Sequence, residues 1–179
     1  FGAVAHVDVL RWHRRVPVVQ PAVISAAQVS ALRAGGKTVA VAIHANHARE
    51  FTGEARAALA RLADAGIMLL SQSVLLSGVN DTVEALEGLM RAFLAARVKP
   101  YYLHHGDLAP GTGHFRVPMA RGKALVAALR GRLSGLGQPA YVVDIPGGFG
   151  KVPVDWCEET AEGILIRAAD GTLHRYPGP

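Results

Sequence analysis

Residues 38–73 read TVAVAIHANHAREFTGEARAALARLADAGIMLLSQS, and this stretch decides the fold class. The apolar, β-branched run at 38–44 predicts a buried strand, and the apolar run at 67–71 predicts a second strand. Between the two runs, alanine and leucine repeat at helical spacing over residues 54–65. A strand, a helix and a strand in this order predict a βαβ unit with two parallel strands.

The same alternation continues on both sides of this unit. Further strands are predicted at residues 6–10, 101–104 and 140–145. Further helices are predicted over residues 25–33, after a cap at Asn80 or Asp81, and from Pro118 onwards. The chain therefore reads as an α/β protein with parallel strands and outer helices, either half of an eight-stranded barrel or a small doubly wound sheet.

The C-terminal stretch has a different pattern. Residues 163–167 and 172–176 are strand-like runs on either side of Asp170-Gly171. Because Asp-Gly is a strong turn signal between two strands, a β-hairpin is predicted here.

The composition narrows the class of protein. Of the 179 residues, 50% are hydrophobic and 18% are charged, which supports one domain with a buried core and excludes a disordered tail. The 19 lysines and arginines are scattered, so the net charge of +5 does not indicate a nucleic-acid binder. Apolar stretches stay short of the roughly 20 residues that a membrane span needs. The single Cys157 excludes an internal disulfide and favours a cytoplasmic location.

Polar side chains fall at the carboxyl ends of the predicted strands. His44, Gln72, His104 and Asp144 each end or follow one strand, and Asp107 comes shortly after the third. Barrels and open α/β sheets build their active sites at these ends, so the residues indicate an enzyme. Asp107 and Asp144 could act as a general acid and base, or together bind a substrate ammonium group.

The most distinctive stretch is DIPGGFGKVP, residues 144–153. It does not fit a phosphate-binding P-loop, because Ile145 and Val152 stand where that motif needs glycine and Ser or Thr. Its glycines let the backbone turn sharply beside a bulky group. Arginine cannot replace lysine in imine chemistry, so one hypothesis is that Lys151 carries pyridoxal phosphate as an imine. The alternative is a surface lysine on a flexible loop.

The histidines allow a second kind of site. His44 and His47 lie three residues apart, and with Asp107 they could hold the metal of a barrel hydrolase. Adjacent strand residues point to opposite faces, so His104 and His105 cannot both reach one ion without a bulge. We therefore favour histidines that hydrogen-bond a cofactor, with capping of a strand end as the alternative for His47 and His105.

Several motifs occur together and in a fixed order. They are His44-Ala-Asn-His47, Gln72-Ser-Val-Leu-Leu76 with Gly78-Val-Asn-Asp81, Pro100-Tyr-Tyr102 with Asp107-Leu108, His114-Phe-Arg116, and Asp144 followed by Pro146-Gly-Gly-Phe-Gly-Lys151-Val-Pro153. This series resembles the lysine 2,3-aminomutases, a radical S-adenosylmethionine family that uses pyridoxal phosphate. The resemblance implies the C-terminal half of a radical-SAM, TIM-like (βα) partial barrel over residues 1–150. It implies a pyridoxal-phosphate lysine loop and a hairpin tail over residues 151–179.

The resemblance also implies roles for individual residues. Lys151 is similar to the lysine that holds pyridoxal phosphate, and it is the expected catalytic residue. Asp107 and Asp144 are similar to the pair that binds the side-chain ammonium of the substrate. His44 and Gln72 match positions that contact S-adenosylmethionine. The implied reaction is the isomerisation of L-lysine to β-lysine by a radical 1,2-amino shift.

Departures from the family pattern limit what this chain can do alone. The three-cysteine motif is absent, so the ligands of the [4Fe–4S] cluster are expected in an N-terminal part outside this chain, and no metal ligand is expected within it. His104 stands where relatives often have tyrosine, and Ser77 where they often have arginine. The full-length protein is expected to be a homo-oligomer without nucleic-acid or membrane partners. One alternative substrate is a lysine of translation elongation factor P, and another alternative is a non-catalytic fragment.

Overall fold

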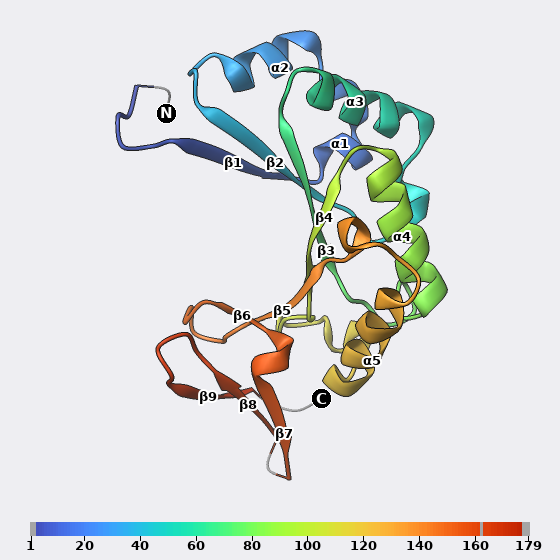
Figure 1. The fold of residues 1–179 in the computed structure, drawn as a ribbon, viewed down its shortest axis with the longest axis vertical. Helices are drawn as coiled ribbons and strands as arrows, with labels where there is room; N and C mark the ends of the chain where they lie inside the picture. The colour runs from blue at the N-terminus through green and yellow to red at the C-terminus, as the bar shows by residue number, and fades with distance from the viewer. Residues whose placement is uncertain (1–2, 162, 177–179) are drawn as a thin grey trace. The chain divides into compact units, whose positions relative to one another are not determined.

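The computed structural model describes residues 3–161 and 163–176, and Figure 1 shows the elements in chain order. The main sheet has six strands: β1 Val9–Arg14, β2 Thr38–His44, β3 Met68–Val74, β4 Lys99–His104, β5 Ala140–Asp144 and β6 Lys151–Pro153. The strands are hydrogen-bonded in this order. A separate three-stranded sheet consists of β7 Cys157–Thr160, β8 Gly163–Arg167 and β9 Leu173–Tyr176.

Helices alternate with the strands of the main sheet. They are α1 Val16–Val19, α2 Ala26–Arg33, α3 Gly53–Asp64, α4 Val83–Ala95 and α5 Met119–Arg130. Short 3-10 helices lie at Pro21–Val23, Ala48–Glu50, Gly113–Phe115, Gly135–Gly137 and Val154–Trp156. Among the described residues, no helix combines the length and the apolar character needed to cross a membrane.

The strand pairings confirm the predicted α/β class. β1 pairs with β2, β2 with β3, and β4 with β5, all in parallel, whereas β6 pairs antiparallel with β5. In the second sheet, β8 and β9 form the predicted hairpin around Asp170-Gly171, where Gly171 has a φ of 88°. The tail differs from the prediction in having a third strand, because β7 pairs antiparallel with β8.

The described residues fall into two compact units. The first unit comprises the chain up to Gln72 together with Gly88–Tyr101, and the second comprises Ser73–Glu87 together with the chain from Tyr102 onwards. In the first unit, all of β2 from Val39 to Ile43 is buried, and the ring of Phe51 meets that of Phe93 edge-on with centroids 5.0 Å apart. The division predicted at residues 150 and 151 rests on the family pattern and stays a prediction.

The helix starts follow from side-chain caps. Thr52 accepts a hydrogen bond from the backbone N–H of Ala55 at 3.2 Å and caps α3. The predicted cap of α4 at Asn80 or Asp81 is wrong, since Thr82 accepts from the N–H of Ala85 at 3.2 Å. Asn80 is instead fully buried in the preceding loop, where its side chain accepts from Leu76 N–H and donates to the carbonyl of Val74. A buried amide with two backbone partners is better satisfied there than at a cap.

Candidate active site

A hairpin in the second unit sets Lys151 beside Asp144. The sequence suggested a flexible loop as one interpretation of residues 144–153, but the chain forms an antiparallel pair in which Asp144 and Lys151 are direct partners. Gly147, Gly148 and Gly150 have φ values of 89°, 83° and 101°, a conformation that favours glycine and closes the turn. The Ile145 N–H donates to the carbonyl of Gly150 at 2.8 Å. The turn therefore fixes which two side chains meet.

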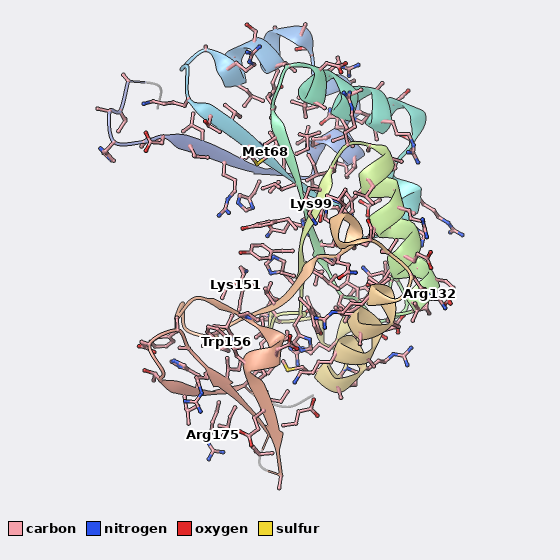
Figure 2. All side chains as sticks on the ribbon, viewed as in Figure 1. Met68, Lys99, Arg132, Lys151, Trp156 and Arg175 are labelled. Atoms are coloured by element: carbon pink, nitrogen blue, oxygen red, sulfur yellow. The ribbon has the colours of Figure 1, made fainter. Side chains whose placement is uncertain are left out.

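Three neighbouring strands bring their side chains to one face of the sheet. His104 on β4 is the register partner of Val142 on β5, and Asp144 lies two residues further along β5, on the same face. Lys151 lies opposite Asp144 on β6, where Figure 2 labels it. Strand alternation and register thus assemble an imidazole, a carboxylate and an amine from residues far apart in the sequence.

The contacts among the three groups are short. Lys151 Nζ donates to Asp144 Oδ1 at 2.5 Å, and His104 Nδ1 lies 3.0 Å from Asp144 Oδ2. His104 Nδ1 also lies 3.2 Å from Lys151 Nζ. The side chain of His104 is 8% exposed, that of Lys151 28% and that of Asp144 50%. The imidazole is therefore the buried member of the set, and the amine and carboxylate are open to a ligand.

The ring of Tyr102 borders the same set. Its residue lies two positions before His104 on β4, so both side chains point to one face. The two rings meet edge-on with centroids 5.8 Å apart, and Lys151 Nζ lies 5.7 Å from the centre of the tyrosine ring. An ammonium group near an aromatic face is favoured by the ring quadrupole. Tyr102 thus gives the amine an apolar wall.

Opposing effects act on the carboxyl group of Asp144. Partial burial raises its pKa, but hydrogen bonds from Lys151 and His104 and the charges of both groups more than offset this. The net result is a pKa below the ordinary value. Asp144 is therefore a carboxylate at neutral pH and can hold a cation.

The opposite face of these strands is packed around His105. Its Nδ1 lies 2.8 Å from the hydroxyl of Tyr141, and its ring meets that of Tyr176 edge-on. The Tyr176 hydroxyl donates to the carbonyl of Gly106 at 2.8 Å. Burial lowers the pKa of His105 to about 4, so this imidazole is neutral at physiological pH. These contacts hold the end of β4, which carries His104 on its other face.

A glycine on α5 accommodates this cluster. A Cβ atom at Gly122 would lie 2.0 Å from the hydroxyl oxygen of Tyr141, a distance that real side chains do not adopt. Glycine is therefore needed at this position even though it lies inside a helix. The aromatic cluster and Gly122 were not predicted from the sequence, because the contact joins residues 19 positions apart whose facing geometry depends on the packing of α5.

The second predicted carboxylate, Asp107, lies beyond the end of β4. It is exposed, and its Oδ1 accepts a hydrogen bond from the N–H of Ala109 at 3.3 Å. Within the described chain, no hydrogen bond or ion pair joins Asp107 to Asp144 or Lys151. The pairing of Asp107 with Asp144 at one substrate ammonium stays a prediction.

The two other predicted cofactor contacts belong to the first unit. His44 and Gln72 are direct register partners at the carboxyl ends of β2 and β3. Because they are register partners, their side chains lie next to each other at this edge of the sheet, and both are partly exposed. Their contact with S-adenosylmethionine stays a prediction.

His47 has a structural role in the same unit. Its Nδ1 accepts from the N–H of Arg49 at 3.1 Å, while Glu50 Oε1 accepts from the N–H of His47 at 3.0 Å. The two residues form a capping box for the 3-10 helix Ala48–Glu50. In residues 3–161 and 163–176, no three His, Cys, Asp or Glu side chains lie close enough to hold a metal ion. The metal-hydrolase alternative, which needed His44, His47 and Asp107, therefore has no support from the geometry.

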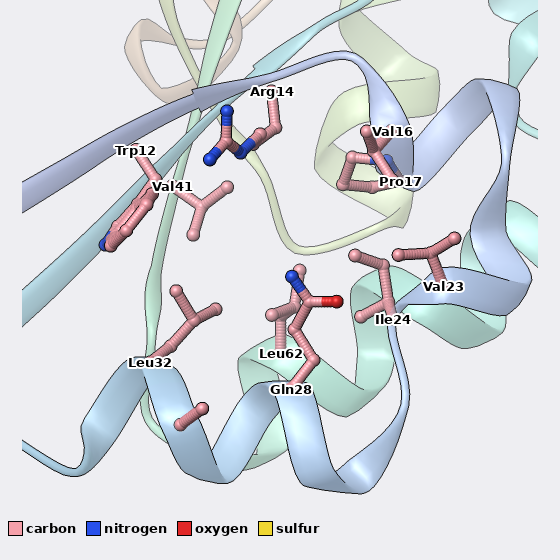
Figure 3. Close-up of a pocket in the computed structure, with 11 residues that line it drawn as sticks. Trp12, Arg14, Val16, Pro17, Val23, Ile24, Gln28, Leu32, Val41 and Leu62 are labelled. Atoms are coloured by element: carbon pink, nitrogen blue, oxygen red, sulfur yellow. The ribbon is translucent and has the colours of Figure 1, made fainter.

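The first unit also contains an apolar pocket of about 390 Å³ (Figure 3). It lies between the sheet and the helices, where Trp12 and Val41 face Leu32 and Leu62, and of its lining residues Arg14 alone is charged. The guanidinium carbon of Arg14 lies 5.2 Å from the centre of the Trp12 ring. A pocket with one charged group does not provide an acid–base pair.

The residues around Lys151 suit pyridoxal phosphate. The amine is partly exposed, a carboxylate and an imidazole flank it, and the preceding glycine turn leaves open space, since a Cβ atom at Gly148 or Gly150 would meet nothing within 4 Å. A lysine that forms an imine needs this combination of access and polar neighbours. A [4Fe–4S] cluster does not fit this chain, because clusters are held by several thiolates and Cys157 is the one cysteine of the sequence.

Comparisons with known proteins agree with the sequence pattern. No protein-family model matches the chain. The L-lysine 2,3-aminomutase of Acetoanaerobium sticklandii is 41% identical over 179 residues, which cover 98% of this chain and 43% of that protein. The enzyme of the same name from Clostridium subterminale is 38% identical over 179 residues, with coverages of 98% and 43%. That of Escherichia coli is 37% identical over 153 residues, with coverages of 86% and 45%.

The matches extend along nearly the whole chain, although the chain spans less than half the length of these relatives. Identities of 37–41% over more than 150 residues agree with the ordered motifs from His44 to Lys151, and they confirm the resemblance inferred from those motifs. Over the matched residues, the chain is similar to the L-lysine 2,3-aminomutases, and it corresponds to less than half of each of these proteins.

Proposed function

We propose that this chain is part of an isomerase that converts L-lysine to β-lysine, with pyridoxal phosphate attached to Lys151. The observation that carries the proposal is the placement of the Lys151 amine against Asp144 and His104 on adjacent strands. When bound, pyridoxal phosphate supplies a conjugated ring that delocalises an unpaired electron during the amino shift.

Each residue of the set has a distinct task in this proposal. Lys151 provides the attachment nitrogen, and Asp144 provides a carboxylate for an ammonium group. His104 holds the second oxygen of that carboxylate, and the buried His105 cluster keeps the end of β4 in place. Asp107 is proposed as the second carboxylate at the side-chain ammonium of the substrate. Two carboxylates favour a long cationic side chain and reject an anionic one.

The first unit is proposed to contact S-adenosylmethionine through His44 and Gln72. Their side chains lie at the carboxyl ends of adjacent parallel strands, the place where α/β sheets bind ligands. The iron–sulfur cluster that starts the radical chemistry in this family would need ligands from outside these 179 residues, given the single cysteine. The proposed activity is therefore that of the complete native protein.

The proposal is tested by amino-acid analysis of the native protein incubated anaerobically with L-lysine, S-adenosylmethionine and pyridoxal phosphate. We expect β-lysine as the product, and we expect Lys151→Arg to abolish its formation, because arginine keeps the charge but forms no imine. Lys99→Arg, a lysine at the start of β4, is the matched control and should remain active. Full activity of Lys151→Arg would overturn the proposal. Replacing free lysine by elongation factor P in the same assay separates the two predicted substrates.

A further inference from the structure

The two oxygens of Asp144 have different partners. Oδ1 accepts from the Lys151 ammonium at 2.5 Å, while Oδ2 lies 3.0 Å from His104 Nδ1. The imidazole is buried and the carboxylate is half exposed. Oδ2 therefore contacts a buried side chain of the sheet. Oδ1 contacts the lysine side chain that the proposed function uses for covalent attachment.

His104 can serve only one of its two neighbours at a time. An imidazole nitrogen, in the neutral or the charged ring, either carries a hydrogen and donates or has a lone pair and accepts. When Nδ1 carries the hydrogen, it donates to Asp144 Oδ2, and Lys151 is left with Oδ1 as its acceptor. When Nδ1 has the lone pair, it accepts from Lys151 Nζ at 3.2 Å and leaves Oδ2 without this donor. The carboxylate is held most firmly in the first state.

Attachment of an aldehyde removes the ammonium group from Asp144. The nitrogen of Lys151 forms a double bond to the aldehyde carbon, and the aldehyde oxygen leaves as water with two of the three ammonium hydrogens. The third hydrogen stays on the nitrogen or leaves as a proton. If the third hydrogen leaves as a proton, the nitrogen is neutral and Oδ1 loses the cation that it holds in this structure. If it stays, one N–H donor remains where the free ammonium had three, so Lys151 binds Oδ1 less strongly.

We propose that Asp144 Oδ1 is a cation site that is used in succession. The ammonium of Lys151 occupies it before cofactor attachment, and an external alkylammonium group occupies it afterwards. His104 acts as the positioning residue that holds Oδ2 during the exchange. This inference rests on the proposed function, and it adds that the chain's own lysine competes with the substrate for one oxygen. The site therefore favours attachment of the cofactor before binding of the substrate side chain.

Competition of this kind makes the two binding events mutually dependent. A cation that binds Oδ1 only after Lys151 has left must in turn favour the attached state of Lys151, because coupling between two sites is reciprocal. An external alkylammonium ion should therefore increase the fraction of Lys151 that carries the cofactor at a limiting cofactor concentration. A substrate site without the exchange would show no such increase.

The test uses the native protein, a limiting amount of pyridoxal phosphate, and N,N-dimethylbutylammonium as the probe. This cation keeps one N–H donor, but its tertiary nitrogen cannot condense with an aldehyde. Borohydride reduction and peptide mass spectrometry measure the fraction of Lys151 that is modified, with sodium chloride at equal ionic strength as the reference. We expect the probe to lower the cofactor concentration needed for half-modification by about 5-fold, the low end of typical couplings.

Variants identify the groups responsible. Asp144→Asn should remove the effect of the probe, whereas Asp155→Asn, an exposed carboxylate elsewhere in the second unit, should retain it. His104→Ala should weaken the effect, and His104→Asn should restore it, because the asparagine amide can place an N–H donor near the position of Nδ1. A purely structural role of His104 would change the modified fraction with and without the probe equally.

Two failures are distinguishable. If Lys151 carries no cofactor in the wild-type protein, the proposed function itself fails. If Lys151 is modified but the probe and sodium chloride give the same half-modification concentration, the proposed function stands and the successive use of Asp144 is overturned. The wild-type comparison gives this answer even if a variant does not fold.

Discussion

In the first unit, His44 and Gln72 face each other at the ends of two parallel strands, and His47 caps the 3-10 helix that follows. In the second unit, the strand ends carry His104 and Asp144, and an antiparallel strand returns to place Lys151 against both. The difference lies in the hairpin. Parallel strands alone bring polar residues to one edge, whereas the added hairpin brings an acid and an amine into direct contact.

The two faces of the second unit also differ from each other. His104 faces the partly exposed set with Asp144 and Lys151, while His105 faces a buried aromatic cluster. His104, the last residue of β4, and His105, which follows it, therefore have separate surroundings, one facing the proposed ligand site and one facing the core.

Acid should destabilise the second unit through His105. Its pKa in the folded protein is about 4 against an ordinary value of 6.5, so the unfolded chain binds a proton at higher pH than the folded one. Stability should fall as the pH drops from 6.5 to 4, by about 3 kcal/mol in all, since each pKa unit corresponds to about 1.4 kcal/mol. Urea unfolding of the native protein at several pH values measures this slope. His105→Gln should flatten it, and a slope that this variant leaves unchanged would contradict the assignment.

The two units should respond to different ligands. Asp144→Asn removes the charge of the carboxylate that is proposed to bind the substrate ammonium, so we expect the KM for L-lysine to rise by about 10- to 100-fold. The apparent KM for S-adenosylmethionine should stay nearly constant. Gln72→Ala should have the reverse pattern. Steady-state kinetics with each ligand varied in turn measures both, and a rise in the same KM for both variants would remove the proposed division of labour.

Replacing two helical glycines by alanine should change the free energy of unfolding in opposite directions. Gly122→Ala forces a Cβ against Tyr141, and overpacking of this kind costs about 1–3 kcal/mol. Gly88 lies inside α4, and the nearest atom to its added Cβ is 4.0 Å away. Gly88→Ala should therefore stabilise by about 0.5–1 kcal/mol through helix propensity. Thermal melts of both variants provide the measurement, and a neutral Gly122→Ala would show that the aromatic cluster packs loosely.

The smallest effect is expected for the contact that joins β9 to the end of β4. Tyr176→Phe deletes the hydrogen bond to the carbonyl of Gly106 and should cost about 1 kcal/mol. The comparison variant is Tyr101→Phe, which changes a tyrosine of the first unit on the same strand, β4. The variant Tyr176→Phe should also lower the affinity for pyridoxal phosphate slightly, because Gly106 lies between His104 and Asp107. An unchanged stability would mean that the second sheet does not support the site.

Much of the fold could be predicted from local patterns. The apolar run at 38–44 coincides with β2, and the Asp-Gly turn lies where the sequence places it. These elements succeed because burial and turn chemistry act within a few residues of the chain. The prediction of the α4 cap was wrong for the opposite reason. Asn80 is hydrogen-bonded to the backbone of Val74 and Leu76, and hydrophobic spacing does not reveal such contacts.

The site was predicted as a set of residues but not as an arrangement. Strand ends indicated His104 and Asp144, and the lone lysine after a glycine turn indicated Lys151. The pairing of Asp144 with Lys151 depends on the register of β5 and β6, and the spacing of seven residues around Pro146-Gly147-Gly148 was the available signal for it. The role of His105 and Gly122 depends on packing across the sheet, which no local pattern encodes.

The central claim is that Lys151, held by Asp144 and His104, is the attachment point of pyridoxal phosphate. The most direct test is borohydride reduction of the native protein with pyridoxal phosphate, followed by peptide mapping. We predict that the label lies on Lys151, within the peptide that contains residues 144–153, and that it is absent from Lys151→Arg. A label on another lysine, or none on the folded wild-type protein, would contradict the claim.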